Sequence, residues 1–291
     1  MSVATLRYKE KRALAAAPPI VRHQRGNGGI DLAFAQAEQG TVLAGLYQRS
    51  PCRVLFPRQP AGEAPLAVLV NISGGLAGGD HVNVAVRIEA GAAATVTTQA
   101  AEKIYRSLGP DAQVETVLAV AEDGRLEWLP QETILFDGAC LDRRMSAAVA
   151  RGGRLLACET LVFGRAARGE TMTSGRVREF WRIECGGRLA WIDRLGLFGT
   201  IAAKLDGMGF GGARALATAV YVGPETSALV PVARAAAEAE GGSATLVNGV
   251  LVARLLGAEP TRVRDGLARL LVALRRAVFG TVSVAPPFWA A

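Results

Sequence analysis

His81–Glu89 reads HVNVAVRIE, and its strict alternation decides the fold class. Val82, Val84, Val86 and Ile88 recur at every second position, with other residue types between them. Because successive side chains of a strand point to opposite faces, this pattern predicts a half-buried β-strand with one apolar face.

The same period of two recurs from about residue 20 to residue 222. The segments that share it are AQVETVLAVA (112–121), GRLEWLP (124–130), ETILFDG (132–138), RLLACETLVFG (154–164), VREFWRIEC (177–185), GRLAWIDRL (187–195) and RALATAVYVG (214–223). Turn-forming pairs such as Asp123-Gly124 and Gly152-Gly153 separate them, and no helices alternate with them. This succession predicts a mainly β fold of stacked or helically coiled strands, either β-helix-like or two layers of antiparallel sheet.

Helical patterns occur only near the C-terminus. Residues 226–240 are rich in alanine, although Pro231 fits best in a first helical turn. Residues 260–279 form the clearest helix, because Gly280 follows them and an apolar stripe runs along them. That stripe is typical of core packing, with partner docking as the alternative. We expect one domain over residues 19–291 with these two helices, preceded by a flexible arm at residues 1–18.

Composition fits a folded globular protein, since 50% of the 291 residues are hydrophobic and 20% are charged. The net charge is +7, carried almost wholly by arginines that form no long run. An acidic protein partner, nucleic-acid binding and a general arginine bias all fit this charge. Only 6% of the residues are aromatic, which leaves little on which nucleic-acid bases could stack.

The four cysteines are widely spaced and form no CxxC pair, which indicates buried reduced thiols. Charged residues stand near the N-terminus where a signal peptide would be apolar, and no apolar run is long enough to span a bilayer. The sequence therefore predicts a cytoplasmic protein that does not enter the membrane.

The glycine-rich stretch GGLAGGD (74–80) invites comparison with a phosphate-binding loop. It lacks the Lys-Ser/Thr of a Walker motif and the GxGxxG spacing, and a strand follows it where a helix would have to begin. We interpret these glycines as tight turns, or as bare backbone that a neighbouring segment approaches closely.

Catalytic and metal-binding motifs are poorly represented. The only histidines are His23 and His81, and no nucleophile elbow is present. Several carboxylates stand near strand ends or glycines, and any two could converge as a catalytic pair or guide a divalent ion weakly in a water-filled passage. These are Asp80, Glu102, Glu132, Asp137, Glu159, Glu170, Asp193 and Asp206. Ion pairing or a solvated surface is the simpler interpretation for each of them.

Two segments concentrate polar groups at predicted strand ends. TTQAAEKIYRS (97–107) places an amide, a lysine, a phenol and a guanidinium close together, and FGRAARGE (163–170) carries two arginines and a glutamate. Each segment is either a polar corner that satisfies its own backbone or a surface that another protein contacts.

Taken in order, SGGLAGGD, TTQAAEKIYRS, EWLPQETILFDGA and FGRAARGE resemble the urease accessory protein family UreD, also called UreH. The resemblance is closest over about residues 70–170, and weaker likeness extends over nearly the whole chain. It implies a coil of strands with a small helical element near the C-terminus, in agreement with the period of two.

The resemblance also implies a role without catalysis. Family members bind UreF, which brings in the GTPase UreG, and together they deliver nickel to apo-urease. It implies a chaperone and scaffold with Ni²⁺ in transit through an internal passage, no tightly bound cofactor, no nucleic acid and GTP hydrolysis in UreG. A dimer of UreD–UreF heterodimers is a further expectation.

From this resemblance we expect two sets of functional residues and no catalytic one. The partner-contact candidates are Lys103, Tyr105, Arg106, Arg165 and Arg168. The weak ion-guiding candidates are Asp80, Glu132, Asp137, Glu159 and Glu170. The alternatives from other classes are a carbohydrate-acting hydrolase that uses a carboxylate pair and a basic RNA-binding module.

Overall fold

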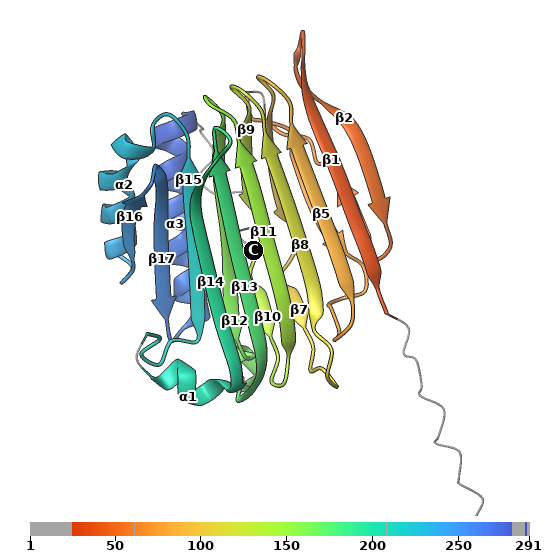
Figure 1. Cartoon of the computed structure of the whole chain (residues 1–291), viewed down its shortest axis with the longest axis vertical. Helices are drawn as coiled ribbons and strands as arrows, with labels where there is room; N and C mark the ends of the chain where they lie inside the picture. Colours follow the sequence, from red (N-terminus) through yellow and green to blue (C-terminus); the bar gives the residue numbers. More distant parts are fainter. Residues whose placement is uncertain (1–24, 61, 208, 281–288, 290–291) are drawn as a thin grey trace, which may run out of the picture.

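The computed structural model describes residues 25–60, 62–207, 209–280 and 289. In this part of the chain, two β-sheets lie face to face and helices lie near one end of the molecule (Figure 1). The mainly β fold expected from the period of two is confirmed. The arm expected at residues 1–18 lies outside the described residues.

The first sheet has the strand order β14-β13-β11-β8-β5-β1-β2. Its strands are β1 (Asn27–Ala37), β2 (Gly40–Arg49), β5 (His81–Ile88), β8 (Ala112–Val120), β11 (Cys140–Val149), β13 (Ser174–Cys185) and β14 (Arg188–Thr200).

The second sheet has the order β16-β17-β15-β12-β9-β6-β4-β3, and the short strands β10 and β7 extend it beside β12. Its strands are β3 (Cys52–Leu55), β4 (Leu66–Asn71), β6 (Ala93–Thr98), β7 (Glu102–Ile104), β9 (Arg125–Leu129), β10 (Thr133–Leu135), β12 (Arg154–Phe163), β15 (Ala215–Val222), β16 (Ser243–Val247) and β17 (Val250–Gly257).

The chain alternates between the sheets, so each coil adds strands to both. β5, β8, β11 and β13 are parallel neighbours, and so are β4, β6, β9 and β12. Of the two arrangements considered, the β-helix-like coil is therefore the observed one. Strands are parallel because each coil returns in the same direction, and antiparallel pairs occur towards the ends of the sheets.

The alternation in β5 is matched by its burial. Val82, Val84, Val86 and Ile88 all face the core between the sheets. β12 is buried along nearly its whole length because sheet one covers one face and helices cover the other. This explains why RLLACETLVF is apolar on both faces.

Three α-helices complete the described part of the chain: α1 (Ile201–Asp206), α2 (Thr226–Glu238) and α3 (Pro260–Phe279). The regions 226–240 and 260–279 thus contain α2 and α3, and Pro231 lies inside α2. The apolar stripe of α3 is buried in a second core against the outer face of sheet two. The short α1 was not expected from the sequence.

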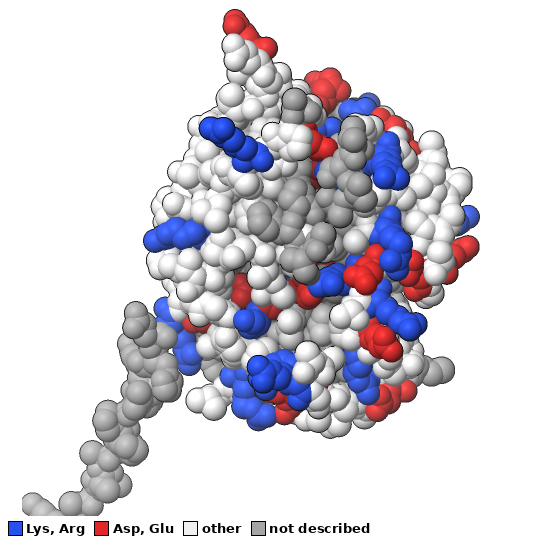
Figure 2. Space-filling view, turned by 180° about the vertical axis from the view of Figure 1, so that it is seen from behind, with Lys and Arg blue, Asp and Glu red and all other residues white. Residues whose placement is uncertain are grey.

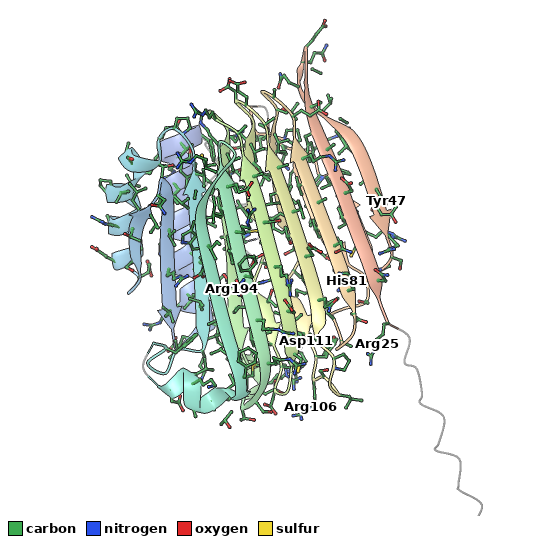
Figure 3. All side chains as sticks on the ribbon, in the orientation of Figure 1. Arg25, Tyr47, His81, Arg106, Asp111 and Arg194 are labelled. Atoms are coloured by element: carbon green, nitrogen blue, oxygen red, sulfur yellow. The ribbon has the colours of Figure 1, made fainter. Side chains whose placement is uncertain are left out.

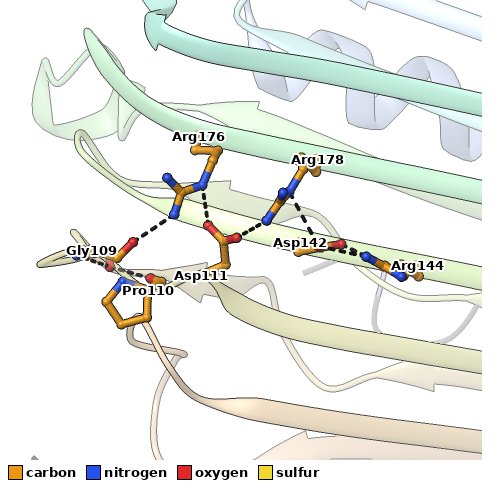
Figure 4. A network of polar contacts seen from close by, with 8 residues as sticks. Gly109, Pro110, Asp111, Asp142, Arg144, Arg176 and Arg178 are labelled. Atoms are coloured by element: carbon orange, nitrogen blue, oxygen red, sulfur yellow. Dashed lines mark hydrogen bonds and ion pairs between the residues drawn. The ribbon is translucent and has the colours of Figure 1, made fainter.

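An ionic network joins three neighbouring strands at one end of sheet one (Figure 4). Asp111 pairs with Arg176 at 2.7 Å and also with Arg178, and Arg178 reaches Asp142 at 3.4 Å. Asp142 also accepts hydrogen bonds from Arg144. The network joins β11 and β13 to the residue that immediately precedes β8, so it supports the register of these strands.

Candidate functional site

A cavity of about 290 Å³ lies between the two sheets. Its wall contains side chains from both sheets, and its exposed lining residues are Gly74, Gln99, Ala100 and Lys103. These residues stand in or beside the connections where sheet two is interrupted, between β6 and β7 and after β4. The interruption therefore forms the mouth of the cavity.

A buried ionic triad lies at the inner side of the cavity. Arg143 of β11 pairs through Nε with Glu159 of β12 and through Nη2 with Glu179 of β13, each at 3.0 Å. Its Nη1 donates a hydrogen bond of 2.9 Å to Thr133 Oγ1. The indole of Trp181 donates to Glu179. All three charged side chains are less than a tenth exposed, so two carboxylates share one guanidinium away from water.

Electrostatics within this triad raise the pKa of both Glu159 and Arg143. Burial raises the pKa of Glu159 to about 8; Arg143 opposes the shift, and the negative charge of Glu179 adds to it. For Arg143, burial disfavours the charged form, but the two carboxylates outweigh it and raise the pKa of the guanidinium.

Glu102 of β7 forms a second polar point on the cavity wall. The amide of Asn71 donates to both of its carboxylate oxygens, at 3.3 and 3.1 Å. Burial raises the pKa of Glu102, although hydrogen bonds from Asn71 and from the Lys103 amide oppose the shift. Cys52 also lines this wall, and burial together with the charge of Glu102 raises the pKa of its thiol to about 11.

The expected ion-guiding residues divide between the cavity and the surface. Glu159 belongs to the triad, and Glu132 is half-buried in the connection between β9 and β10, where its carbonyl accepts the Glu102 amide. Asp80 instead binds the main chain: its two carboxylate oxygens accept hydrogen bonds from the backbone amides of Gly26 and Ala77, each at 2.7 Å. The structure thus brings only part of this set to the cavity.

Asp137 and Glu170 belong to a polar network at one end of the molecule. Asp137 accepts hydrogen bonds from Thr173 and Ser174 and pairs with Arg106 at 2.6 Å. Burial opposes ionisation, but these hydrogen bonds and Arg106 together lower the pKa of Asp137 to about 2. Glu170 accepts the Asp137 amide and pairs with Arg165.

The expected partner-contact residues lie at this same end (Figure 3 labels Arg106). Tyr105 packs edge-on against Phe136 with centroids 5.1 Å apart, and Arg165 lies over the same ring at 4.3 Å. Arg168 is exposed in the short 3₁₀-helix Ala166–Arg168, and Lys103 is exposed at the cavity mouth. The two polar segments identified in the sequence therefore form one rim, defined by Lys103, Tyr105, Arg106, Asp137, Arg165, Arg168 and Glu170.

Basic and acidic side chains are interspersed over the back of the molecule (Figure 2). Arg106 and Arg165 are already paired with carboxylates, so the rim is a mixed ionic surface. In the part of the chain that the structure describes, no group of three His, Cys, Asp or Glu side chains is arranged to hold a metal ion.

The glycines of GGLAGGD serve close approach, as expected. A Cβ on Gly75 would lie 2.6 Å from the Tyr105 ring, and one on Gly78 would lie 2.0 Å from Ser107 Oγ. The loop thereby lets the segment 103–107 pack directly against it beside the cavity mouth.

The cysteines are free thiols; three are buried, but Cys185 is exposed, which differs from the expectation that all four are buried.

Sequence reasoning did not name Arg143 or Glu179, and it listed Glu102 among the available carboxylates without choosing it as an ion-guiding candidate. A signal for the triad was present, because Arg143 alternates with Leu141 and Met145 in the phase of buried residues. Glu179 stands in the same phase as Val177 and Trp181 on its own strand. A charge in the apolar phase of a strand indicates a buried polar cluster.

Two sheets built by one coil of strands, with a polar cavity between them and an ionic rim near its mouth, define a coiled-β protein with an internal chamber. The family model of the UreD urease accessory protein matches residues 26–290. The chain therefore belongs to the UreD urease accessory protein family, and membership indicates an accessory role in urease maturation and not a catalytic one.

Curated relatives agree over most of the chain. The sequence is 43% identical over 267 residues to a urease accessory protein UreD of Methylobacterium sp. (strain 4-46), covering 89% of this chain and 94% of that protein. It is 40% identical over 270 residues to the UreD protein of Rhodopseudomonas palustris (strain BisB5), with 92% and 94% covered. A UreD protein of Magnetococcus marinus is 39% identical over 256 residues, with 85% and 89% covered.

None of the described helices is long and apolar enough to cross a membrane.

Proposed function

We propose that this chain is a scaffold and chaperone that binds apo-urease together with UreF and UreG and gives Ni²⁺ a protected path between its two sheets. The cytoplasm is the proposed location, and the proposed assembly is a dimer of heterodimers with UreF. In this proposal GTP hydrolysis occurs in UreG. The observation that carries the proposal is the cavity, which joins the mouth at Lys103 to the buried triad.

The chemistry of the cavity wall suits a cation in transit. Ni²⁺ accepts carboxylate and amide oxygens, and the wall presents Glu102, Glu159 and the side chain of Asn71 among apolar residues. Glu102 is already hydrogen-bonded to Asn71, and Glu159 is already paired with Arg143. A cation must compete with these partners, so we expect it to be held weakly and released readily.

Co-expression of urease with its accessory set, with and without this chain, tests the proposal. We expect urease formed without the chain to contain little nickel and to have little activity. The matched control supplies the chain and withholds UreG. It shows how urease behaves when nickel delivery fails although this chain is present, and so separates failed nickel delivery from failed folding of urease. Fully nickel-loaded urease in the absence of this chain would contradict the proposal.

A further inference from the structure

Both sheets end on the same side of the molecule. β2 is the last strand of sheet one and β3 is the last strand of sheet two, and a short turn joins them (Figure 1). The helices lie towards the opposite side. The β2–β3 edge, defined as residues 40–56 together with Ile72, is therefore an end of the coil that no other described strand or helix covers. Coiled folds usually require a polar cap at such an end.

Apart from a register shift at Ala44 in its pairing with β1, β2 lacks the features that normally protect an edge strand. It runs for ten residues, GTVLAGLYQR, with no proline and no charge before Arg49. The other terminal strand of sheet one, β14, carries Arg188, Asp193 and Arg194, and the terminal strand β16 is only five residues long. Charges and short length discourage pairing with another chain, so β2 is the terminal strand most open to it.

Both faces of the edge are apolar and exposed. Leu43 and Leu46 stand opposite Phe34 and Leu32 on the core side, whereas Val42 and Tyr47 stand on the outer face (Figure 3 labels Tyr47). The exposed apolar side chains of the edge are between 39% and 59% exposed, and they are Val42, Leu43, Leu46, Tyr47, Leu55, Phe56 and Ile72. Contiguous apolar surface of this kind marks a contact with another molecule.

The charges around the edge indicate the charge of that other molecule. Arg49 donates to the neutral Asn27 and Arg53 to the carbonyl of Cys52. Neither Arg49 nor Arg53 pairs with a carboxylate in the described part of the chain. A second copy would bring the same positive charges towards the β2–β3 edge. An acidic occupant is therefore favoured over self-association.

We propose that β2 is a docking edge that takes up an extended, acidic segment of a partner protein as an added strand. The main-chain N–H and C=O groups on the open side of β2 would pair with the segment. Alternate apolar side chains of the segment would cover Leu43 and Leu46 on one face and Val42 and Tyr47 on the other. The inference goes beyond the proposed nickel path and does not depend on it, because no step involves a metal.

A defined peptide tests the edge on the full chain. The probe is a fluorescein-labelled peptide of alternating valine and threonine with glutamates at both ends, and its matched control has lysines at both ends. We expect the glutamate peptide to bind about tenfold or more tightly than the lysine peptide at low salt. Amide hydrogen exchange should slow in residues 41–49 when the glutamate peptide binds.

Protein variants locate the site. Leu46→Gln should weaken binding of the glutamate peptide by about tenfold or more, because an uncharged polar group then replaces an apolar contact of the edge. Leu108→Gln alters an exposed leucine outside the edge and should leave binding unchanged. Arg49→Glu combined with Arg53→Glu should reverse the preference between the two peptides. Thermal unfolding of each variant confirms that the fold is retained.

Four results would overturn the proposal. Equal binding of the two peptides removes the charge argument, and binding without exchange protection in β2 places the site elsewhere. A peptide methylated on alternate backbone nitrogens that binds as tightly as the parent excludes strand addition. Protection of β2 that rises with protein concentration in the absence of peptide would assign the edge to a second copy. None of these results concerns nickel content, so failure here is distinct from failure of the proposed function.

Discussion

At the residue scale, the most unusual feature is a charged triad buried between the two sheets. Arg143, Glu159 and Glu179 come from three different strands and meet only because those strands are neighbours across the two sheets. Buried ion pairs add little net stability, but removing one partner leaves an uncompensated charge. Removing one member of the triad should therefore lower the free energy of unfolding more than removing one member of a surface ion pair.

Replacing the shared guanidinium tests this difference. Arg143→Met leaves Glu159 and Glu179 without their cation, and we expect the free energy of unfolding to fall by about 3–5 kcal/mol. Arg144→Met is the matched control, because that side chain is exposed and pairs with Asp142 at the surface; its cost should be about 0–1 kcal/mol. Urea denaturation followed by circular dichroism measures both, and equal costs would contradict the argument.

Asp137 makes stability depend on pH in a defined direction. Its pKa is about 2 in the folded protein and about 3.9 in an unfolded chain, so its contribution is present above the unfolded value and is lost as the pH falls through about 2. Asp137→Asn should lower the free energy of unfolding at neutral pH, and the two proteins should converge in acid. Urea denaturation from pH 7 to pH 2 measures this convergence.

A second variant checks the cause. Thr173→Val removes the hydroxyl that donates to Asp137 at 2.7 Å but keeps the backbone donor. It should reproduce part of the loss at neutral pH, by about 0.5–1.5 kcal/mol. A gap between wild type and Asp137→Asn that stays constant down to pH 2 would refute the assignment.

At the element scale, α3 is anchored to sheet two by charge as well as by its apolar stripe. Arg275 is buried and donates through Nε to Glu127 Oε1 at 2.7 Å, and Thr95 donates to the same carboxylate. Glu127 lies on β9 and Thr95 on β6, so one arginine ties the helix to two strands. The helix that sequence periodicity identified is thus part of the folded core on one face.

The anchor can be tested against a neighbour on the same helix. Arg275→Met leaves the buried Glu127 without its cation, and the expected loss is about 3–5 kcal/mol of unfolding free energy. Arg276→Met changes an exposed arginine one position further along and should cost less than about 0.5 kcal/mol. Thermal unfolding of the two variants provides the comparison; similar shifts would show that Glu127 does not depend on Arg275.

At the scale of the whole molecule, the cavity exists because the two sheets do not meet completely where sheet two is interrupted. Thr116 of β8 is buried and lines this cavity, whereas its neighbour Val117 is exposed on the outer face of the sheet. The two positions therefore allow the same substitution inside and outside the proposed path.

Thr116→Phe should obstruct the cavity, and urease matured with this variant should contain less nickel and have lower activity. Val117→Phe adds the same ring to the outer face and should leave both unchanged. Overpacking at Thr116 costs about 1–3 kcal/mol, so recovery of the folded variant is confirmed by thermal unfolding before maturation is compared. Normal nickel loading with a folded Thr116→Phe variant would contradict a path through the cavity.

The local sequence pattern predicted much of the fold but little of the arrangement of the candidate site. Alternation identified β5 and the apolar phase of its neighbours, glycine pairs marked turns, and the stripe at 260–279 marked α3. The interpretation of the glycines in 74–80 as backbone that a neighbouring segment approaches closely is confirmed at Gly75 and Gly78. Tyr105, Arg106 and Arg165 were identified as polar groups, but their common place at one rim was not visible in the sequence.

By itself, the sequence determined that this protein is built from strands, which faces of those strands are apolar, and to which family it belongs. All three follow from residue order along the chain, where side-chain direction repeats with a period of two. Only the tertiary structure decided that the strands coil in parallel, that Arg143 meets Glu159 and Glu179, and that β2 is the last strand of its sheet. These depend on which distant segments become neighbours, and that is fixed by the packing of the whole coil and not by any local stretch.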